Sequence, residues 1–263
     1  MKLIKQKAKF VSILSIAGSD NSAGAGIQSD IKTAQSLGCY CFTAITCVTS
    51  QNSEKVYKIE NVSNELILSQ VNSILNVYKI DAIKIGLLPN FLVAHSLIKI
   101  LSKKKIPLVI DPIFKSSTGQ KFMKSNIYKA IYKELSSLSS IYTPNYDEGR
   151  ILVNGGEKKL SDRALLKKIH DLYKIPIVLT GINDKKEGKI NYLIEKKKIQ
   201  TFRVKKIQSS STHGTGCCFS TALAINLARG FDFSKSIENS QIHVYESIMK
   251  AHNFGVEYGP IGS

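Results

Sequence analysis

Two short glycine-containing segments, far apart in the chain, have the composition of anion-binding loops. Residues 21–26 and residues 213–217 each place a Gly-x-Gly pair just before an expected helix. Glycine lets the backbone approach a ligand closely, and free N–H groups at a helix N-terminus attract negative charge. Neither segment continues into the Gly-Lys-Ser/Thr of a P-loop, and neither completes the Gly-x-Gly-x-x-Gly of a dinucleotide fold. The pattern fits either another kind of anion site or two tight turns that only begin helices.

Cys217 is the nucleophilic side chain with the most distinctive setting. It opens a helix directly after the second glycine segment, where the helix terminus is expected to lower the pKa of its thiol. His213 lies four residues earlier, and we expect it to shape the loop rather than to form a Cys–His couple. The other four cysteines fit no common zinc spacing and are expected to be small packing residues. An odd number of cysteines in a chain of this size indicates a reducing compartment, which we expect to be the cytoplasm.

These residues need a scaffold that brings distant segments together, and the chain alternates short apolar runs with helical segments. Strands are expected at 10–17, 43–49, 82–85, 107–110, 140–142, 177–179, 192–194 and 201–204, the last two as a hairpin. Helices are expected at 27–37, 64–77, 93–101, 127–138, 161–173, 217–228 and 234–250. The alternation predicts a three-layer α/β/α fold with a mostly parallel central sheet. No linker or internal repeat divides the chain, so we expect residues 1–263 to form a single domain.

Polar, glycine or carboxylate residues follow nearly every expected strand. Ligands of open parallel sheets bind beyond the carboxyl ends of the strands, so these residues are expected to share one rim. They are found at 18–20, 50–52, 86–87, 111, 145–148, 180–181 and 213–217.

Composition excludes several classes of protein. Hydrophobic residues make up 43% and charged residues 22% of the 263 residues, which is typical of a globular chain and not of a disordered one. No apolar run approaches the roughly 20 residues of a membrane-spanning helix, so no membrane partner is expected. Residues 1–17 are basic and then apolar, like a signal peptide, but this stretch runs directly into the polar segment 18–20. We therefore expect a buried first strand.

The charge balance favours an anionic partner, because the formal net charge is +17. Nucleic-acid surfaces use arginine heavily, whereas only four of the 37 basic residues here are arginine. The lysines are spread along the chain in short runs. These features weigh against nucleic acid and for a solvated basic surface.

Several segments together resemble the hydroxymethylpyrimidine/phosphomethylpyrimidine kinases of thiamine synthesis, within the ribokinase-like superfamily. The resemblance runs in order from Ile13 to about Gly230. The segments that carry it are 16–30, 43–53, 84–88, 111–119, 143–148 and 212–217. The first and last are specific as a pair, whereas the others are weaker alone.

The resemblance implies ATP-dependent phosphorylation of the hydroxymethyl group of 4-amino-5-hydroxymethyl-2-methylpyrimidine, and then of its monophosphate to the pyrophosphate. ATP and Mg²⁺ are the implied cofactors, and the oligomeric state stays open, a homodimer included. The implied catalytic groups are Cys217 and the backbone N–H groups of Gly214, Thr215 and Gly216. The implied pyrimidine pocket contains Gln51, Gly18, Asp30 and Leu87. The implied nucleotide site contains Asn145, Thr180 and Gly181, and the implied Mg²⁺ site contains Glu148 and Asp111.

The chain also departs from the family pattern. Thr180 stands where the family often has lysine before a glycine pair, and Ser117 stands where it often has lysine before Ser-Gly. Losing two cations that face phosphate predicts weaker nucleotide binding, or charge supplied from elsewhere, such as Lys115 or Lys121. These changes leave open a pyridoxal-type vitamin kinase of the same superfamily. A third interpretation is a non-catalytic binding protein that uses its basic surface, although most of the implied site is intact.

Overall fold

The computed structural model describes residues 10–116, 119–153, 160–184, 188–205, 207, 209, 211–256 and 259–262. Its strands are β1 (Ser12–Asp20), β2 (Tyr40–Gln51), β3 (Val56–Asn61), β4 (Ala82–Ile85), β5 (Leu108–Ile110), β6 (Ile141–Tyr142), β7 (Ile177–Asp184), β8 (Gly188–Glu195) and β9 (Lys198–Lys205). They form one sheet in the order β3-β2-β1-β4-β5-β6-β7-β8-β9. Strands β2 to β7 in this order run parallel, whereas β3, β8 and β9 add antiparallel edges.

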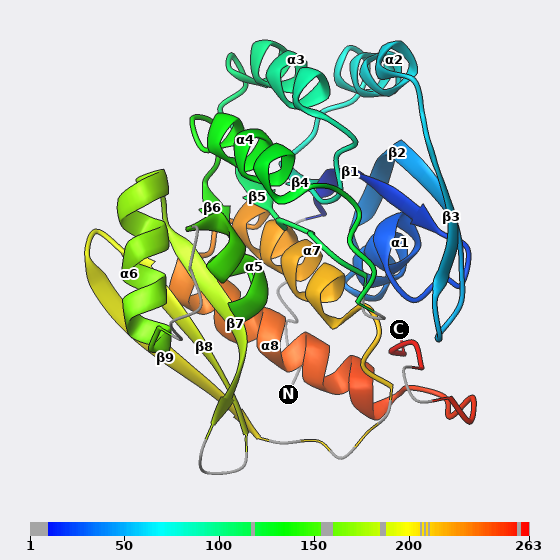
Figure 1. Ribbon diagram of the computed structural model, residues 1–263. Helices are drawn as coiled ribbons and strands as arrows, with labels where there is room; N and C mark the ends of the chain where they lie inside the picture. Colours follow the sequence, from blue (N-terminus) through cyan, green and yellow to red (C-terminus); the bar gives the residue numbers. More distant parts are fainter. Residues whose placement is uncertain are drawn as a thin grey trace, which may run out of the picture.

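Helices cover both faces of the sheet (Figure 1). One layer consists of α2 (Asn64–Leu75), α3 (Phe91–Leu101), α4 (Ser125–Leu135), α5 (Tyr146–Leu152) and α6 (Asp162–Tyr173). The other layer consists of α1 (Gly26–Ser36), α7 (Thr215–Ala228) and α8 (Phe233–Met249). Successive side chains of a strand point to opposite faces, so Leu14 packs in the first layer and Ile13 in the second. The predicted three-layer α/β/α fold with a mostly parallel sheet is confirmed.

The first strand is buried, as predicted from its apolar sequence, but it is longer than predicted. Every residue from Ser12 to Ala17 is buried, and β1 continues through residues 18–20, which we expected to follow the strand. Its pairing with β2 shifts register between Ala17 and Ser19. The strand therefore carries its polar end directly into the rim of the sheet.

Two elements were not predicted. Strand β3 is an edge strand whose residues are mostly exposed, so it lacks the apolar signal of a buried strand. Helix α5 has seven residues and begins inside segment 143–148, which reads Thr-Pro-Asn-Tyr-Asp-Glu. In addition, the side chain of Ser63 caps α2.

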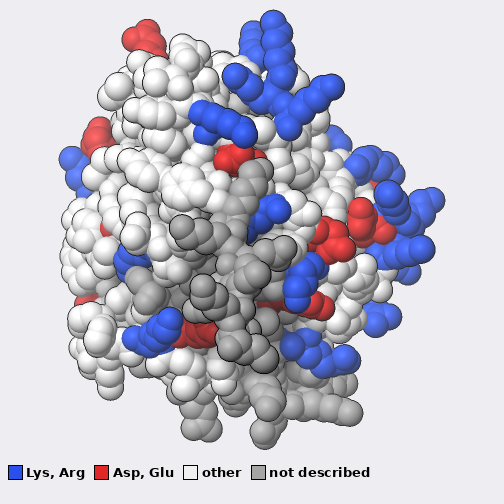
Figure 2. Space-filling model, turned by 180° about the vertical axis from the view of Figure 1, so that it is seen from behind, with Lys and Arg blue, Asp and Glu red and all other residues white. Residues whose placement is uncertain are grey.

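All five cysteines are free thiols, and all but Cys41 are buried. The burial of Cys39, Cys47 and Cys218 agrees with their expected role as packing residues. None of the helices that the structure describes has the length and apolar composition needed to cross a bilayer. On the face shown in Figure 2, lysine and arginine side chains gather at the top and right of the view, and smaller separate groups lie elsewhere on the face. Acidic side chains lie between some of these groups, so the described part of this face carries no continuous basic stripe.

Candidate active site

A cavity of about 640 Å³ lies at the carboxyl ends of the parallel strands. Its walls come from the ends of β1, β2 and β7, from the segments after β4, β5 and β6, and from the N-terminus of α7. Every site residue implied by the sequence lines this cavity, with the exception of Asp30. The topology thus gathers residues from Gly18 to Cys217 at one rim, as expected of an open parallel sheet.

The two glycine segments pack directly against each other. Gly214 has φ +91°, and a Cβ atom on it would lie 1.7 Å from the carbonyl oxygen of Gly24. A Cβ atom on Gly24 would lie 1.9 Å from the ring of His213. Only glycine permits this approach, because a larger residue at either position would force the loops apart. The segments are therefore parts of one structure rather than two independent turns.

Asp20 fastens this structure from the end of β1. Its Oδ2 accepts hydrogen bonds from Ala25 N (2.8 Å) and His213 Nε2 (2.9 Å), and its Oδ1 accepts from the backbone and hydroxyl of Ser22. Burial alone would raise the pKa of Asp20, but these hydrogen bonds outweigh it and hold that pKa below its usual value. His213 accordingly shapes the loop, in agreement with the sequence analysis.

The N-terminus of α7 opens into the cavity. Gly214 is its N-cap and provides no side-chain cap, and the first N–H groups of a helix have no intrahelical acceptor. The Thr215 N–H has only a long contact with the Thr212 carbonyl, at 3.4 Å. The N–H groups of the first turn are thus arranged to bind an anion such as a phosphoryl group.

Cys217 faces the cavity as a neutral thiol. Burial raises its pKa to about 12, although the positive charge of Lys84 acts in the opposite direction. The prediction that the helix terminus lowers this pKa is wrong. The free-energy cost of removing the thiolate from water exceeds the stabilisation that the helix terminus provides. The thiol hydrogen-bonds to Asp111, which also accepts from Ser220 Oγ at 3.0 Å. Burial raises the pKa of Asp111 as well.

Asp30 does not belong to the pyrimidine pocket, which corrects the sequence-based assignment. Its carboxylate is fully buried and lies 2.9 and 3.0 Å from the ammonium of Lys84, which is also fully buried. Ser15 Oγ and Thr221 Oγ1 donate further hydrogen bonds to it, at 2.5 and 2.7 Å. Both carboxylate oxygens of Asp30 accept hydrogen bonds from side chains of α7, β1 and β4. Asp30 therefore links these elements beneath the cavity and cannot contact a ligand.

Glu148 and Asn145 form a capping box at the start of α5. Asn145 Oδ1 accepts from Glu148 N at 3.0 Å, and Glu148 Oε2 accepts from Asn145 N at 2.9 Å. Burial, and then the nearby carboxylate of Asp111, raise the pKa of Glu148 to about 8. Two buried carboxyl groups that disfavour each other's ionisation have the charge and oxygen atoms that suit Mg²⁺. The residues present therefore fit a divalent cation.

The opposite part of the cavity is formed by β7, β8 and α8. Gly181 has φ +68°, and its N–H donates to Asn191 Oδ1 at 2.9 Å. Lys189 and Asn191 of β8 line this wall, and sequence reasoning missed both because the strand was expected to begin at Tyr192. The remaining surface is largely apolar, with Val204, Ile207, Val244 and Ile248.

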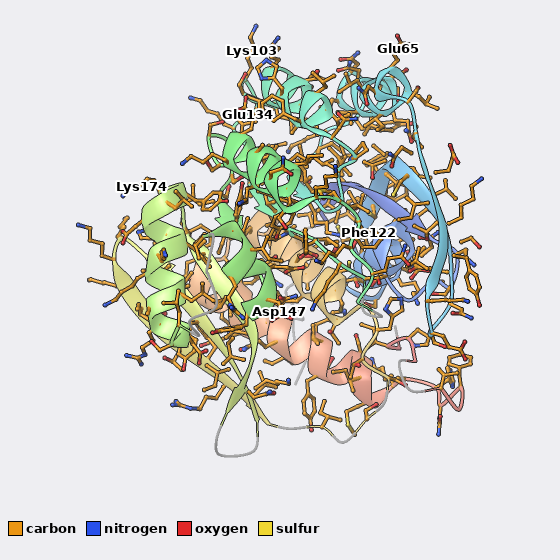
Figure 3. The ribbon with its side chains drawn as sticks, in the orientation of Figure 1. Glu65, Lys103, Phe122, Glu134, Asp147 and Lys174 are labelled. Atoms are coloured by element: carbon orange, nitrogen blue, oxygen red, sulfur yellow. The ribbon has the colours of Figure 1, made fainter. Side chains whose placement is uncertain are left out.

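The residues implied in pyrimidine binding lie together at the ends of β1 and β2. A Cβ atom on Gly18 would lie 2.7 Å from Cys47 Sγ, so a larger residue would not fit against β2 at this position. Gln51 N is held by Asn21 Oδ1 at 2.7 Å, and the carbonyl of Leu87 accepts from a buried threonine. Phe122, from the segment before α4, adds an aromatic side chain to the lining (Figure 3).

The two lysines named as substitutes for the missing cations differ in position. Lys115 lines the cavity and donates to Asp147 Oδ2 at 2.7 Å; Asp147 projects from α5 in Figure 3. Lys121 instead lies over the ring of Phe114 and is not part of the cavity lining. Ser117 lies outside the described residues.

Comparison with known proteins gives a consistent result. A family model described as phosphomethylpyrimidine kinase matches residues 20–262. A hydroxymethylpyrimidine/phosphomethylpyrimidine kinase of Aquifex aeolicus (strain VF5) is 31% identical over 247 residues, which cover 93% of this chain and 97% of the relative. A protein of the same description from Saccharomyces cerevisiae is 32% identical over 255 residues, but this chain spans only 46% of its length.

Solved structures of two related kinases superpose on this chain. The ADP complex of Bacillus subtilis pyridoxal kinase has a TM-score of 0.86 and 29% identity, covering 97% of each chain. Phosphomethylpyrimidine kinase from Clostridium difficile 630 has a TM-score of 0.76 and 26% identity, covering 90% of this chain and 99% of the other. The architecture is therefore that of ribokinase-like vitamin kinases.

Proposed function

The chain belongs to the phosphomethylpyrimidine kinase family, and from that premise we propose that it phosphorylates 4-amino-5-hydroxymethyl-2-methylpyrimidine with ATP. The monophosphate is then the second substrate, and its phosphorylation gives the pyrophosphate needed for thiamine biosynthesis. The observation that carries this proposal is the single cavity that the α7 N-terminus, Asp111 and Glu148 share. The names of the curated relatives support the same substrate pair.

In this proposal the two substrates meet at the first turn of α7. Gln51, Gly18 and Leu87 hold the pyrimidine, while Thr180 and Gly181 contact the nucleotide. The substrate's hydroxyl oxygen bonds to the γ-phosphorus as the bond to the β–γ bridging oxygen breaks, and ADP leaves with that electron pair. Positioning and charge stabilisation provide most of the catalysis of phosphoryl transfer. The N–H groups at positions 214–216 supply the charge stabilisation.

Cys217 and Asp111 act as a pair in this scheme. Because the pKa of the thiol is raised to about 12, Cys217 enters the reaction protonated and hydrogen-bonded to Asp111. The hydroxyl proton of the substrate passes to this pair, and the carboxylate of Asp111 is the acceptor, with Cys217 orienting the hydroxyl.

Glu148 and Asp111 would hold Mg²⁺, with Asn145 fixing the orientation of Glu148 through the capping box. The described residues contain no group of three His, Cys, Asp or Glu side chains placed to hold a metal ion. Mg²⁺ commonly keeps several water ligands and binds substrate phosphates beside one or two carboxylates, so two carboxylates are sufficient. The ion would neutralise charge on the phosphates.

The proposal is tested by measuring ADP release with Mg-ATP and, separately, the hydroxymethylpyrimidine, its monophosphate, pyridoxal and ribose. Turnover with the first two substrates is the expected result. Pyridoxal is the relevant alternative substrate because the chain is similar to the Bacillus subtilis enzyme. A preference for pyridoxal would mean that the proposed substrate is wrong and that the proposed phosphoryl transfer is right. The absence of ADP release with all four substrates, in a folded sample, would favour a non-catalytic protein.

The proposal also includes the cellular compartment and the oligomeric state of the enzyme. The free, mostly buried cysteines support a reducing cytoplasm. A homodimer is proposed from the family resemblance alone, and size-exclusion chromatography with light scattering would test it. A monomer at micromolar concentration would contradict it.

A further inference from the structure

We propose that Lys189 is the residue that binds the nucleotide phosphates in this chain and sets its affinity for ATP. The proposal rests on the kinase function and adds a residue to the nucleotide site. Lys189 lies on β8, an antiparallel strand outside the segments that resemble the family, and its side chain lines the cavity. No position on β8 was among the residues implied by the sequence.

Charge pairing distinguishes Lys189 from the other lysine of the cavity. Among the described lining residues the lysines are Lys115 and Lys189. The ammonium of Lys115 is 2.7 Å from a carboxylate oxygen of Asp147, and this ion pair already compensates its charge. Lys189 Nζ instead donates to the neutral amide oxygen of Asn183 at 2.6 Å. Among the side chains that the structure describes, it has no carboxylate partner within 4.0 Å.

The strand pairing fixes Lys189 beside the proposed nucleotide residues. Lys189 pairs with Asn183 of β7, only two residues beyond Gly181. Two residues further along β8, Asn191 points to the same face of the sheet and accepts the Gly181 N–H at 2.9 Å. This bond ties β8 to the wall formed by Thr180 and Gly181. The lysine is therefore held on that wall and not on a free loop.

The electrostatics of the cavity require such a cation. A triphosphate must enter a space that already contains the carboxyl groups of Asp111 and Glu148. A divalent ion between those groups compensates charge at one end only. An ammonium is a compact charge with three donors, which suits oxygens whose exact position differs between ATP and ADP. Lys189 is exposed, and no side chain of Asp or Glu that the structure describes pairs with it, so its charge can act on the phosphates at the other end.

The test measures ADP binding directly, by titration calorimetry, on the full-length protein. Lys189→Ala is expected to weaken ADP binding about tenfold or more, the range of a charged hydrogen bond, and to raise the KM for ATP similarly. The KM for the pyrimidine should stay within about twofold. Lys189→Arg should retain most of the affinity. Lys198→Ala, at the far end of the same hairpin, is the matched control and should bind ADP normally.

A second variant distinguishes the loss of the Lys189 positive charge from structural damage to β8. Thr180→Lys in the Lys189→Ala background places an ammonium on the same wall from β7 and should recover most of the lost affinity. Unchanged ADP binding in Lys189→Ala would overturn the proposal, as would a larger loss in Lys115→Ala. Weakened ADP binding in Lys189→Ala, together with no phosphorylation of any tested alcohol by the unmodified chain, would support the role of Lys189 in nucleotide binding and refute the proposed reaction. An unmodified chain that does not bind ADP would refute both.

Discussion

Lys84→Met is expected to be strongly destabilising, because it leaves the buried carboxylate of Asp30 without its counter-ion. Both side chains of the pair have zero exposure, and their charged atoms lie 2.9 Å apart. Removing one partner of a buried ion pair costs about 3–5 kcal/mol, a large part of a total stability of roughly 5–15 kcal/mol. At about 2–4 °C per kcal/mol for a chain of this size, the expected fall in Tm is roughly 6–20 °C.

The double variant Lys84→Met/Asp30→Asn tests the reason for this loss. An asparagine can accept from one of the Ser15 and Thr221 hydroxyls, which lie against different carboxylate oxygens, and donate its amide N–H to the other. It leaves no buried charge. Replacement of a whole buried pair is often close to neutral, so the double variant should be more stable than Lys84→Met alone. Thermal and urea unfolding followed by circular dichroism suit a chain without tryptophan.

Two results would refute this reasoning. The first is a cost below about 1 kcal/mol for Lys84→Met, which would mean that the charges are solvated. The second is a double variant no more stable than the single one. A raised KM for the pyrimidine in Asp30→Asn, without loss of stability, would return Asp30 to the substrate pocket.

Four further substitutions test the site. Cys217→Ala should lower kcat at least tenfold in steady-state assays, because the hydroxyl loses its orienting partner; near-normal turnover would contradict that role. Gln51→Ala should raise the KM for the pyrimidine more than the KM for ATP, and equal effects would remove Gln51 from the pyrimidine pocket. Glu148→Gln should raise the Mg²⁺ concentration needed for half-maximal rate. Because the pKa of Glu148 is raised to about 8, the ionisation of this carboxyl lowers the stability of the folded protein as pH rises from about 4.5 to 8. Glu148→Gln should therefore stabilise the Mg²⁺-free protein more at pH 9 than at pH 5. A difference in Tm that does not depend on pH would contradict the raised pKa. Gly214→Ala should abolish most activity, since its Cβ would lie 1.7 Å from the Gly24 carbonyl oxygen; a fully active variant would show that the loops need not touch.

The buried parallel strands could be predicted from the sequence because they combine short apolar runs with glycine or polar ends. The edge strand β3 could not, since its exposed residues carry no such pattern. Helix α5 was missed although its signal was present: Asn145 and Glu148 have the spacing of a capping box, but only their ligand-binding role was considered.

The errors within the site have different physical causes. Asp30 shares a face of α1 with Ile27, Thr33 and Ala34, all buried, so helical spacing alone would have placed it in the interior. The state of the Cys217 thiol depends on burial by elements distant in sequence, and no local pattern reports that. The contribution of Lys189 depends on how β8 pairs with β7, which motif comparison does not include.

The contact between the two glycine segments has a consequence for synthesis of the chain. Asp20 and His213 are 193 positions apart, and the backbone of His213 also bonds to Gly259 and Ile261 near the end of the chain. At about 5–20 residues per second, the ribosome needs roughly 10–40 s to make the residues between the two halves of the loop structure. A nascent chain can therefore form β1, β2 and β4 long before it can bind a nucleotide. Ligand binding by this protein begins only after the residues around His213 have been made, so ATP can stabilise the assembled site but cannot guide the early steps of folding.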